Sequence, residues 1–177
     1  GCGLMGSGIA EVCARKGRSV VVLEVDAAAA ERGRAKVRKS LDGAVTRGKL
    51  SDADHAAAWS QLELTTDWSA FGDCDLVVEA VSEDPTIKVD AFRRLDEAVR
   101  GSEAILASNT SSIPIMKLAT ATSRPEQVIG IHFFNPVPVL PLVELVPSLM
   151  TSAATTETAA VFAHEVLGKH VIRSQDR

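Results

Sequence analysis

A histidine and a glutamate lie close together in the sequence, in a pattern that suits the oxidation of an alcohol. His132 lies in the run HFFNPVP at the end of an apolar stretch, and Glu144 follows in the apolar run LVELV. Alcohol oxidation needs a base for the hydroxyl proton, and histidine suits this role because its unperturbed pKa is about 6.5. A nearby carboxylate would fix the imidazole tautomer and stabilise the imidazolium. A structural histidine at a strand end and an edge-strand glutamate facing water remain the alternatives.

The chain opens with a glycine pattern that can hold a pyrophosphate. The run GCGLMGSGIA places Gly1, Gly3 and Gly6 at GxGxxG spacing, and a helical pattern follows directly. Glycines permit a tight turn and a close approach of the backbone to phosphates, while the helix N-terminus provides free N–H groups and a positive dipole end. The spacing alone is weak evidence, because a glycine-rich helix start contains the same letters.

An acidic residue at the end of the next predicted strand strengthens this interpretation. Glu24 closes the apolar part of SVVVLEV, near the position about 20 residues after the glycine loop where an acid contacts the adenosine ribose. A carboxylate there would repel the 2′-phosphate of NADP, so the pattern predicts NAD. Asp26 competes for this role, and we prefer Glu24 because Asp26 lies beyond the apolar run.

A loop rich in hydroxyls and amides, SNTSSIP at residues 108–114, follows another predicted strand. Ligands of open parallel sheets bind at the carboxyl ends of strands, so this loop can bond a substrate oxygen or a nicotinamide. A helix N-cap at Ser112 is the alternative. Glu79 and Glu83 also follow a strand and are candidates to face the cofactor, with Lys88 about one helical turn beyond Glu83.

Strands and helices alternate along the chain, which predicts a parallel sheet covered on both faces. Apolar runs predict buried strands at residues 19–25, 75–80, 104–108 and 128–133, with weaker candidates at 62–66 and 142–146. Helical patterns cover residues 6–16, 27–48, 51–59, 85–99, 113–119 and 155–167. The stretch 27–60 is longer than a crossover between strands requires. We therefore predict a doubly wound, Rossmann-type α/β fold with a helical insertion, forming one NAD-binding domain over residues 1–177.

Composition and charge argue against several other classes of protein. The net charge is −4, and the basic residues are scattered, so no basic face for nucleic acid is expected. No apolar run reaches the roughly 20 residues that cross a bilayer, and no signal-peptide pattern opens the chain. The three cysteines have no metal-ligand spacing and indicate a reduced setting. We expect a cytoplasmic protein without a metal and without nucleic-acid or membrane partners.

Taken together, the runs GCGLMGSGIA, VVEAVSED, SNTSSIP, HFFNPVPVLPLVE and LGK resemble the NAD-binding domain of the 3-hydroxyacyl-CoA dehydrogenase family. The resemblance covers essentially the whole chain, and SNTSS followed by HFFNP and an acidic residue is its most specific part. It implies oxidation of a (3S)-3-hydroxyacyl-CoA, such as 3-hydroxybutyryl-CoA, to a 3-oxoacyl-CoA with NAD. The implied pathway is fatty-acid β-oxidation or butyryl-CoA metabolism.

The resemblance also implies roles for particular residues. His132 would be the catalytic base, Glu144 its partner, and Ser111 the contact to substrate and nicotinamide. The implied NAD contacts are Gly1, Gly3, Leu4, Met5, Gly6, Glu24, Glu83, Lys88 and Asn135. The insertion at residues 27–60 resembles the family's helical hairpin, where Ser40 would contact coenzyme A and Arg47 or Lys49 would face its phosphates. A solvated helix face is the alternative for these two cations.

Two departures from the family pattern matter for the expected activity. The family's first strand would precede Gly1, and a helical C-terminal domain carrying the dimer interface and an active-site asparagine would follow Arg177. We therefore expect an inactive fragment of a homodimeric enzyme that is less stable by itself. The alternatives are a sugar-acid dehydrogenase of the same fold, a β-hydroxyacid dehydrogenase sharing the glycine loop, and a non-catalytic NAD-sensing module. The intact HFFNPVP run with His132 and Glu144 favours the acyl-CoA enzyme.

Overall fold

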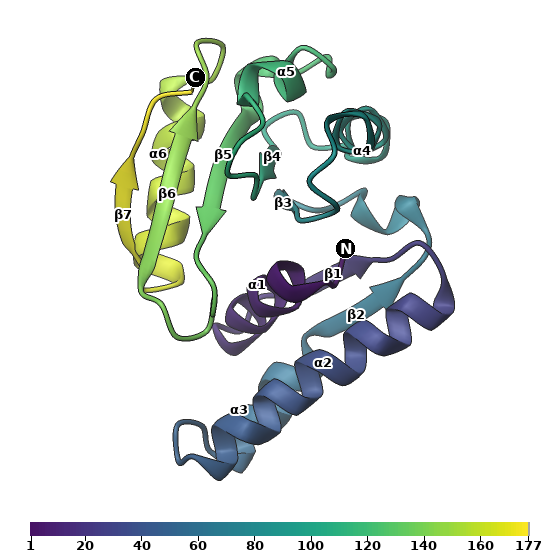
Figure 1. Cartoon of the computed structure of the whole chain (residues 1–177), viewed down its shortest axis with the longest axis vertical. Helices are drawn as coiled ribbons and strands as arrows, with labels where there is room; N and C mark the ends of the chain where they lie inside the picture. The colour runs from purple at the N-terminus through teal and green to yellow at the C-terminus, as the bar shows by residue number, and fades with distance from the viewer. Residues whose placement is uncertain (177) are drawn as a thin grey trace. The chain divides into compact units, whose positions relative to one another are not determined.

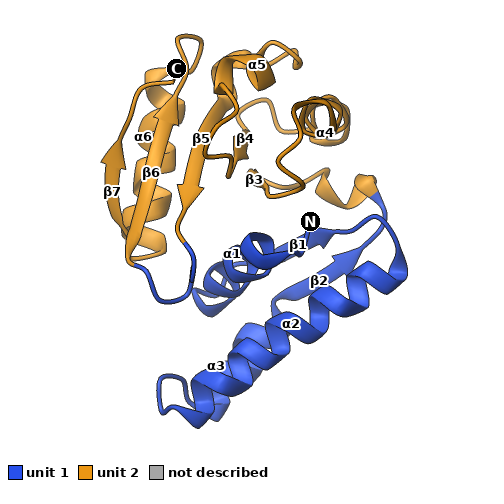
Figure 2. Ribbon diagram, in the orientation of Figure 1, with its two compact units in different colours: residues 1–67, 135–140 blue, residues 68–134, 141–177 orange. Residues whose placement is uncertain are grey.

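The computed structural model describes residues 1–176, which fold into two compact units (Figure 2). The first unit contains residues 1–67 and 135–140, and the second contains residues 68–134 and the chain from 141 onward. The chain therefore leaves the second unit after Phe134 and returns to it at Pro141. Among the described residues, no helix combines the length and the apolar character needed to cross a membrane.

The first unit is a small α/β arrangement built on two parallel strands. Its elements are α1 (Leu4–Arg15), β1 (Val20–Leu23), α2 (Ala27–Thr46), α3 (Asp52–Ser60) and β2 (Leu62–Thr65). Strand β1 pairs with β2 in parallel, and α2 with α3 form the predicted helical hairpin between them (Figure 1). The apolar faces of the three helices and of β1 form one core. This core contains Cys2, Ala10, Ala14, Val22, Val37, Leu41 and Ala58.

Side-chain caps determine where the helices of the first unit begin. The Asp26 carboxylate accepts a 2.6 Å hydrogen bond from the N–H of Ala29 at the start of α2, and Ser51 caps α3 as predicted. The segment 135–140 also packs in this unit, against α1. A Cβ added at Gly8 would lie 2.9 Å from the Cβ of Val137, so only glycine permits this close contact.

The second unit is larger and holds a five-stranded sheet within the described residues, in the order β3-β4-β5-β6-β7 (Figure 1). Its strands are β3 (Leu76–Glu79), β4 (Ile105–Ser108), β5 (Val128–Phe133), β6 (Leu142–Pro147) and β7 (His170–Arg173). Its helices are η1 (Trp68–Phe71), α4 (Pro85–Ala98), α5 (Ile115–Ala119), η2 (Pro125–Gln127), α6 (Ala153–Val161) and the π-helical η3 (Phe162–Val166).

The direction of the strands changes once within this sheet. Strands β3, β4 and β5 are parallel to one another, β6 runs antiparallel to β5, and β7 runs parallel to β6. Helix α5 packs on β5, while α6 packs on β5 and β6. The centre of the sheet contains fully buried apolar residues, among them Leu106, Ile129 and Leu145.

The predicted Rossmann-type α/β fold with a mainly parallel sheet is confirmed. Two details differ from the predictions. Residues 170–173 form β7, a strand that was not predicted because the run HVIR is short and mostly exposed. The last predicted helix, 155–167, begins at Ala153 as α6 and continues as a π-helical segment from Phe162.

Candidate active site

The antiparallel pairing of β5 and β6 brings the predicted catalytic pair together. His132 and Glu144 are direct partners in the register of the two strands, so their side chains project from the same face. The distance between His132 Nδ1 and Glu144 Oε2 is 3.0 Å, and the two side chains are 18% and 24% exposed. The ring of Phe134 packs against the imidazole, with the ring centroids 4.5 Å apart. The prediction that these two residues meet is therefore confirmed by their geometry.

The surroundings of Glu144 determine which imidazole nitrogen carries the proton. Ser174 Oγ donates a hydrogen bond to Glu144 Oε1, and this bond, followed by the one to His132, holds the pKa of Glu144 below its ordinary value. An ionised carboxylate can only accept hydrogen bonds, so His132 Nδ1 must be the donor. The lone pair of Nε2 is then available to take a proton from a hydroxyl group.

The SNTSS loop is held by hydrogen bonds to one carboxylate. Thr110 Oγ1 and Ser112 Oγ both donate to Glu83 Oε1, the latter over 2.9 Å. Thr110 Oγ1 in turn accepts from the backbone N–H of Ile113 at 3.0 Å. Ser111 lies between these anchored residues, and its side chain is exposed. The loop therefore presents the hydroxyl of Ser111 from a fixed backbone.

The alternative role of Ser112 as a helix cap is wrong. Helix α5 begins after Pro114, which makes no side-chain cap, and the Ser112 hydroxyl bonds to Glu83 instead. The first N–H groups of α5 are bonded by Asp176, whose two carboxylate oxygens accept from Ile115 at 2.7 Å and from Met116 at 2.8 Å. Asp176, which is distant in sequence, therefore bonds the start of the helix that Ser112 was considered to cap.

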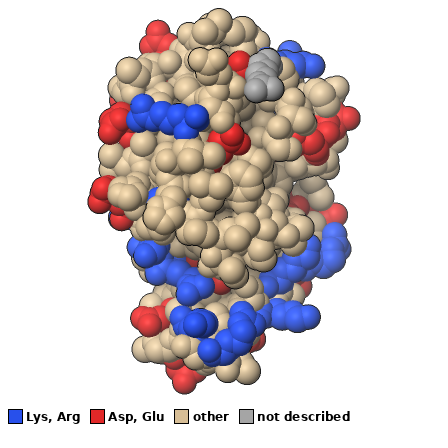
Figure 3. Space-filling view, turned by 60° about the vertical axis from the view of Figure 1, so that its left-hand side comes forward, with Lys and Arg blue, Asp and Glu red and all other residues tan. Residues whose placement is uncertain are grey.

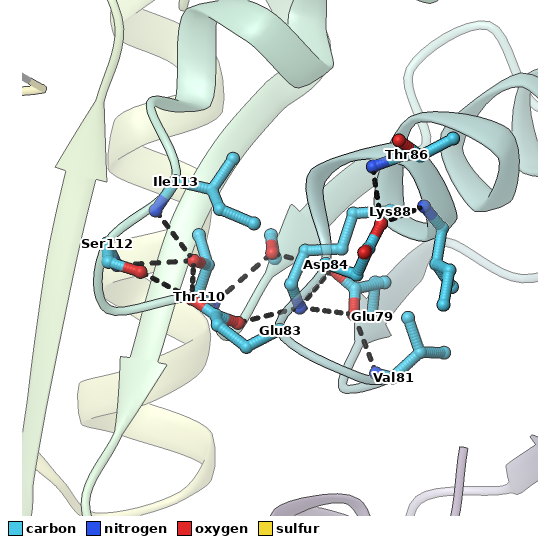
Figure 4. A network of polar contacts seen from close by, with 11 residues as sticks. Glu79, Val81, Glu83, Asp84, Thr86, Lys88, Thr110, Ser112 and Ile113 are labelled. Atoms are coloured by element: carbon cyan, nitrogen blue, oxygen red, sulfur yellow. Dashed lines mark hydrogen bonds and ion pairs between the residues drawn. The ribbon is translucent and has the colours of Figure 1, made fainter.

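An ionic network around Lys88 joins Glu83, the carboxylate that holds the loop, to Glu79 (Figure 4). Lys88 Nζ lies 2.7 Å from Glu79 Oε1 and 3.2 Å from Glu83 Oε2, and the Lys88 side chain is 1% exposed. Glu79 also accepts a 2.7 Å hydrogen bond from Ser108 Oγ and a 2.6 Å bond from the N–H of Val81. Glu79 was a candidate to face the cofactor, and this prediction is wrong. Its side chain is 2% exposed and points into this network.

Glu83 differs from Glu79 because its side chain is 44% exposed. Partial burial raises the pKa of Glu83, but the hydrogen bonds from Thr110 and Ser112 and the charge of Lys88 outweigh this and hold the pKa below its ordinary value. Of the two predicted cofactor contacts in this region, Glu83 is accessible to a ligand. Lys88 is buried beneath it and orients its carboxylate.

A pocket of about 490 Å³ adjoins the SNTSS loop in the second unit. Its walls include Ser111, Ser112, Glu144, Ser174 and Asp176. It therefore brings two of the predicted catalytic residues to one cavity, together with two polar residues that the sequence analysis missed. Ser174 and Asp176 follow β7 in a short polar segment that carries no recognisable motif, so only the fold reveals their position.

The glycine loop and Glu24 lie together in the first unit. The Glu24 carboxylate accepts hydrogen bonds from the backbone N–H of Cys2, inside the loop, and from that of Val25 at 3.3 Å. A Cβ added at Gly3 would meet nothing within 4 Å, so no packing among the described residues requires glycine there. Asp26, the competing acid, is engaged as the cap of α2. An open glycine loop with an acid beside it fits a pyrophosphate and its adjoining ribose.

The remaining predicted contacts of the first unit lie at its surface. Leu4 is 69% exposed, Asn135 is exposed, and Met5 is half-buried in the first turn of α1. On α2 and after it, Ser40 is half-buried, while Arg47 and Lys49 are exposed. Figure 3 shows lysine and arginine side chains gathered at the level of α2 and α3. The positions are compatible with a phosphate ligand, and the assignment of each contact stays a prediction.

Comparison with known proteins supports the family resemblance over the whole chain. A family model described as "3-hydroxyacyl-CoA dehydrogenase, NAD binding domain" matches residues 1–177. A 3-hydroxybutyryl-CoA dehydrogenase of Mycobacterium tuberculosis is 51% identical over 177 residues, which are 100% of this chain and 62% of that protein. The chain thus spans less than two thirds of this relative.

Solved structures agree with these sequence matches. The crystal structure of M. tuberculosis FadB2 has a TM-score of 0.99 and 51% identity, covering 100% of this chain and 62% of that one. The (S)-3-hydroxybutyryl-CoA dehydrogenase PaaH1 of Ralstonia eutropha has a TM-score of 0.96 and 42% identity, with the same coverage.

Proposed function

Because the chain belongs to the 3-hydroxyacyl-CoA dehydrogenase family and matches its NAD binding domain, we propose that the protein oxidises a (3S)-3-hydroxyacyl-CoA to the 3-oxoacyl-CoA with NAD. The observation that carries the proposal is the hydrogen-bonded pair of His132 and Glu144, with Ser111 and Glu144 in the wall of one pocket. We place the reaction in fatty-acid β-oxidation or butyryl-CoA metabolism, as the family resemblance implies.

In this proposal the catalytic pair handles the hydroxyl proton of the substrate. His132 Nε2 takes that proton, and the positive charge which then develops on the ring is stabilised by Glu144 at 3.0 Å from Nδ1. Ser111 donates a hydrogen bond to the substrate oxygen, which keeps the oxygen directed toward the base. NAD, when bound, accepts the hydride that leaves C3 of the substrate.

The residues proposed to hold NAD fall into two groups. In the first unit, Gly1, Gly3 and Gly6 bring backbone N–H groups to the pyrophosphate, with Leu4 and Met5 in the same turn, and Glu24 accepts from the adenosine ribose. Asn135 is the other proposed contact of that unit. In the second unit, Glu83 is the accessible contact, and Lys88 acts by orienting it.

Coenzyme A is proposed to lie along α2. Ser40 would hydrogen-bond the CoA moiety, and the exposed cations Arg47 and Lys49 would pair with its phosphates. We further propose that residues 1–177 act as one NAD-binding domain within a cytoplasmic, homodimeric enzyme. Light scattering on the full-length protein would test the dimer.

The first experiment measures NADH oxidation with acetoacetyl-CoA, using the full reading frame that contains this chain. We expect turnover in the wild type and a loss of about a hundredfold or more in His132→Gln, the scale expected for a general acid–base. His164→Gln is the control, because His164 is 63% exposed and lies on the π-helical segment. Tight NADH binding without turnover would instead favour a sugar-acid substrate or an NAD-sensing module.

A further inference from the structure

Ser174 lies where its hydroxyl can control the carboxylate of the catalytic pair. Its backbone N–H donates a 2.9 Å hydrogen bond to the carbonyl of Leu145, which continues the pairing of β6 with β7 by one residue. Leu145 is the neighbour of Glu144 in β6, and the Ser174 hydroxyl donates to Glu144 Oε1. The main chain of Ser174 is thus fixed by the sheet, and its side chain reaches the acid.

The two oxygens of Glu144 therefore have different partners. Oε2 accepts from His132 Nδ1 at 3.0 Å, and Oε1 accepts from Ser174. A carboxylate held at one oxygen only can rotate about its last side-chain torsion, which is broad for glutamate. A carboxylate held at both oxygens keeps its plane, so Oε2 stays directed at the imidazole.

Asp176 fixes the segment that carries Ser174. Its carboxylate accepts two backbone hydrogen bonds at the start of α5, from Ile115 and Met116. The residues after β7 are therefore tied on one side to β6 and on the other to the helix that follows the SNTSS loop. Ser174 and Asp176 also line the same pocket as Ser111.

We propose that Ser174 is a positioning residue for the proton-transfer step, and that it acts by holding the Glu144 carboxylate in the orientation that places the proton on His132 Nδ1. This inference rests on the proposed function for its effect on turnover, but its effect on the His132 tautomer is independent of any substrate. The hydroxyl of Ser174 does not touch the reacting atoms and needs no chemistry of its own.

The test compares Ser174→Ala with Ser174→Thr in the full reading frame that contains this chain. Ser174→Ala is expected to lower kcat about tenfold, the low end of the effect of a hydrogen bond to a charged group, with KM within about twofold. Ser174→Thr keeps the hydroxyl and should recover most of the rate. Ser123→Ala is the matched control, because it removes a hydroxyl that donates to the mostly buried carboxylate of Asp96 at 3.1 Å.

The tautomer is read directly from the ¹⁵N chemical shifts of the His132 ring. Neutral His132 should carry its proton on Nδ1 in the wild type and in Ser174→Thr, and should become a mixture of tautomers in Ser174→Ala. The carboxyl ¹³C signal of Glu144 should also show its pKa rising toward the ordinary value in Ser174→Ala, because the leading cause of the lowering is removed.

The outcomes separate this inference from the proposed function. Unchanged tautomer and unchanged Glu144 titration in Ser174→Ala would overturn the role of Ser174, whatever the rates are. Equal losses of kcat in Ser174→Ala and Ser123→Ala would also overturn it, since they would point to a general loss of structure. A wild type without dehydrogenase activity would remove the proposed function, while the tautomer shift would still support the positioning role. If Ser174→Ala does not fold, Ser174→Cys, with a weaker donor of similar size, should give intermediate values of the same readouts.

Discussion

Replacing Lys88 by methionine should destabilise the protein strongly, because it leaves a buried carboxylate without its cation. Lys88 and Glu79 have side chains that are 1% and 2% exposed, and their charged atoms lie 2.7 Å apart. Removing one partner of a buried ion pair costs about 3 to 5 kcal/mol. Glu79 keeps its hydrogen bonds from Ser108 and Val81, so we expect the low end, about 3 kcal/mol.

The measurements are urea unfolding and thermal unfolding at pH 7, both monitored by circular dichroism. A loss of about 3 kcal/mol corresponds to a decrease in Tm of roughly 6 to 12 °C for a chain of this size. Two further variants make the result specific. Arg173→Met removes a cation from an exposed pair with Glu157, and it should cost less than about 1 kcal/mol. The double variant Glu79→Gln/Lys88→Met should recover part of the loss, because no buried charge remains unpaired.

A Lys88→Met cost as small as that of Arg173→Met would refute the reasoning. It would mean that Glu79 is protonated or reached by water when Lys88 is absent. The network would then not keep a charged carboxylate away from solvent. A double variant less stable than Lys88→Met would refute it in another way, since it would show that the Glu79 carboxylate is stabilised without its cation.

The remaining predictions concern two other carboxylates. Glu24→Gln should weaken NADH binding about tenfold by calorimetry, since a charged acceptor for ribose hydroxyls is lost. Asp26→Asn keeps a good helix cap and should bind NADH like the wild type; equal losses in both would contradict the assignment of Glu24. Asp96 has a pKa below its ordinary value: burial raises it, but hydrogen bonds from Ser123 and from Arg124 outweigh burial. Asp96 therefore stabilises the folded protein fully above its unfolded pKa of about 3.9, and this stabilisation is lost as pH falls through its lower folded pKa. The Tm of Asp96→Asn should therefore fall less steeply in acid than the Tm of the wild type.

The sequence predicted most of the elements, because their patterns are local. Buried strands such as 128–133 read as continuous apolar runs, and helix starts such as Ser51 carry their own caps. The family resemblance drawn from five short runs is confirmed by the family model, which covers the same residues. Strand β7 was missed because it lies at the edge of the sheet, where a short strand needs no apolar pattern.

The candidate site was predictable where its residues carry motifs, and unpredictable where only the fold brings them together. His132 and Glu144 could be paired in advance, but the reversal of β6 that makes them direct neighbours could not be read from LVELV. Glu79 and Glu83 look alike in the sequence and both pair with Lys88, and only the fold shows that Glu79 is buried and Glu83 accessible. Ser174 reaches Glu144 from 30 residues away, through the pairing of β6 with β7.

The path of the chain between the two units limits how the gene can be divided. Residues 135–140 belong to the first unit although they lie between strands β5 and β6 of the second. A fragment that ends at residue 67 would therefore lack Val137, and the glycine face of α1 at Gly8 would be left without its packing partner. A single cut in the gene cannot yield both units intact. An isolated first unit would have to be expressed with residues 135–140 attached through a linker.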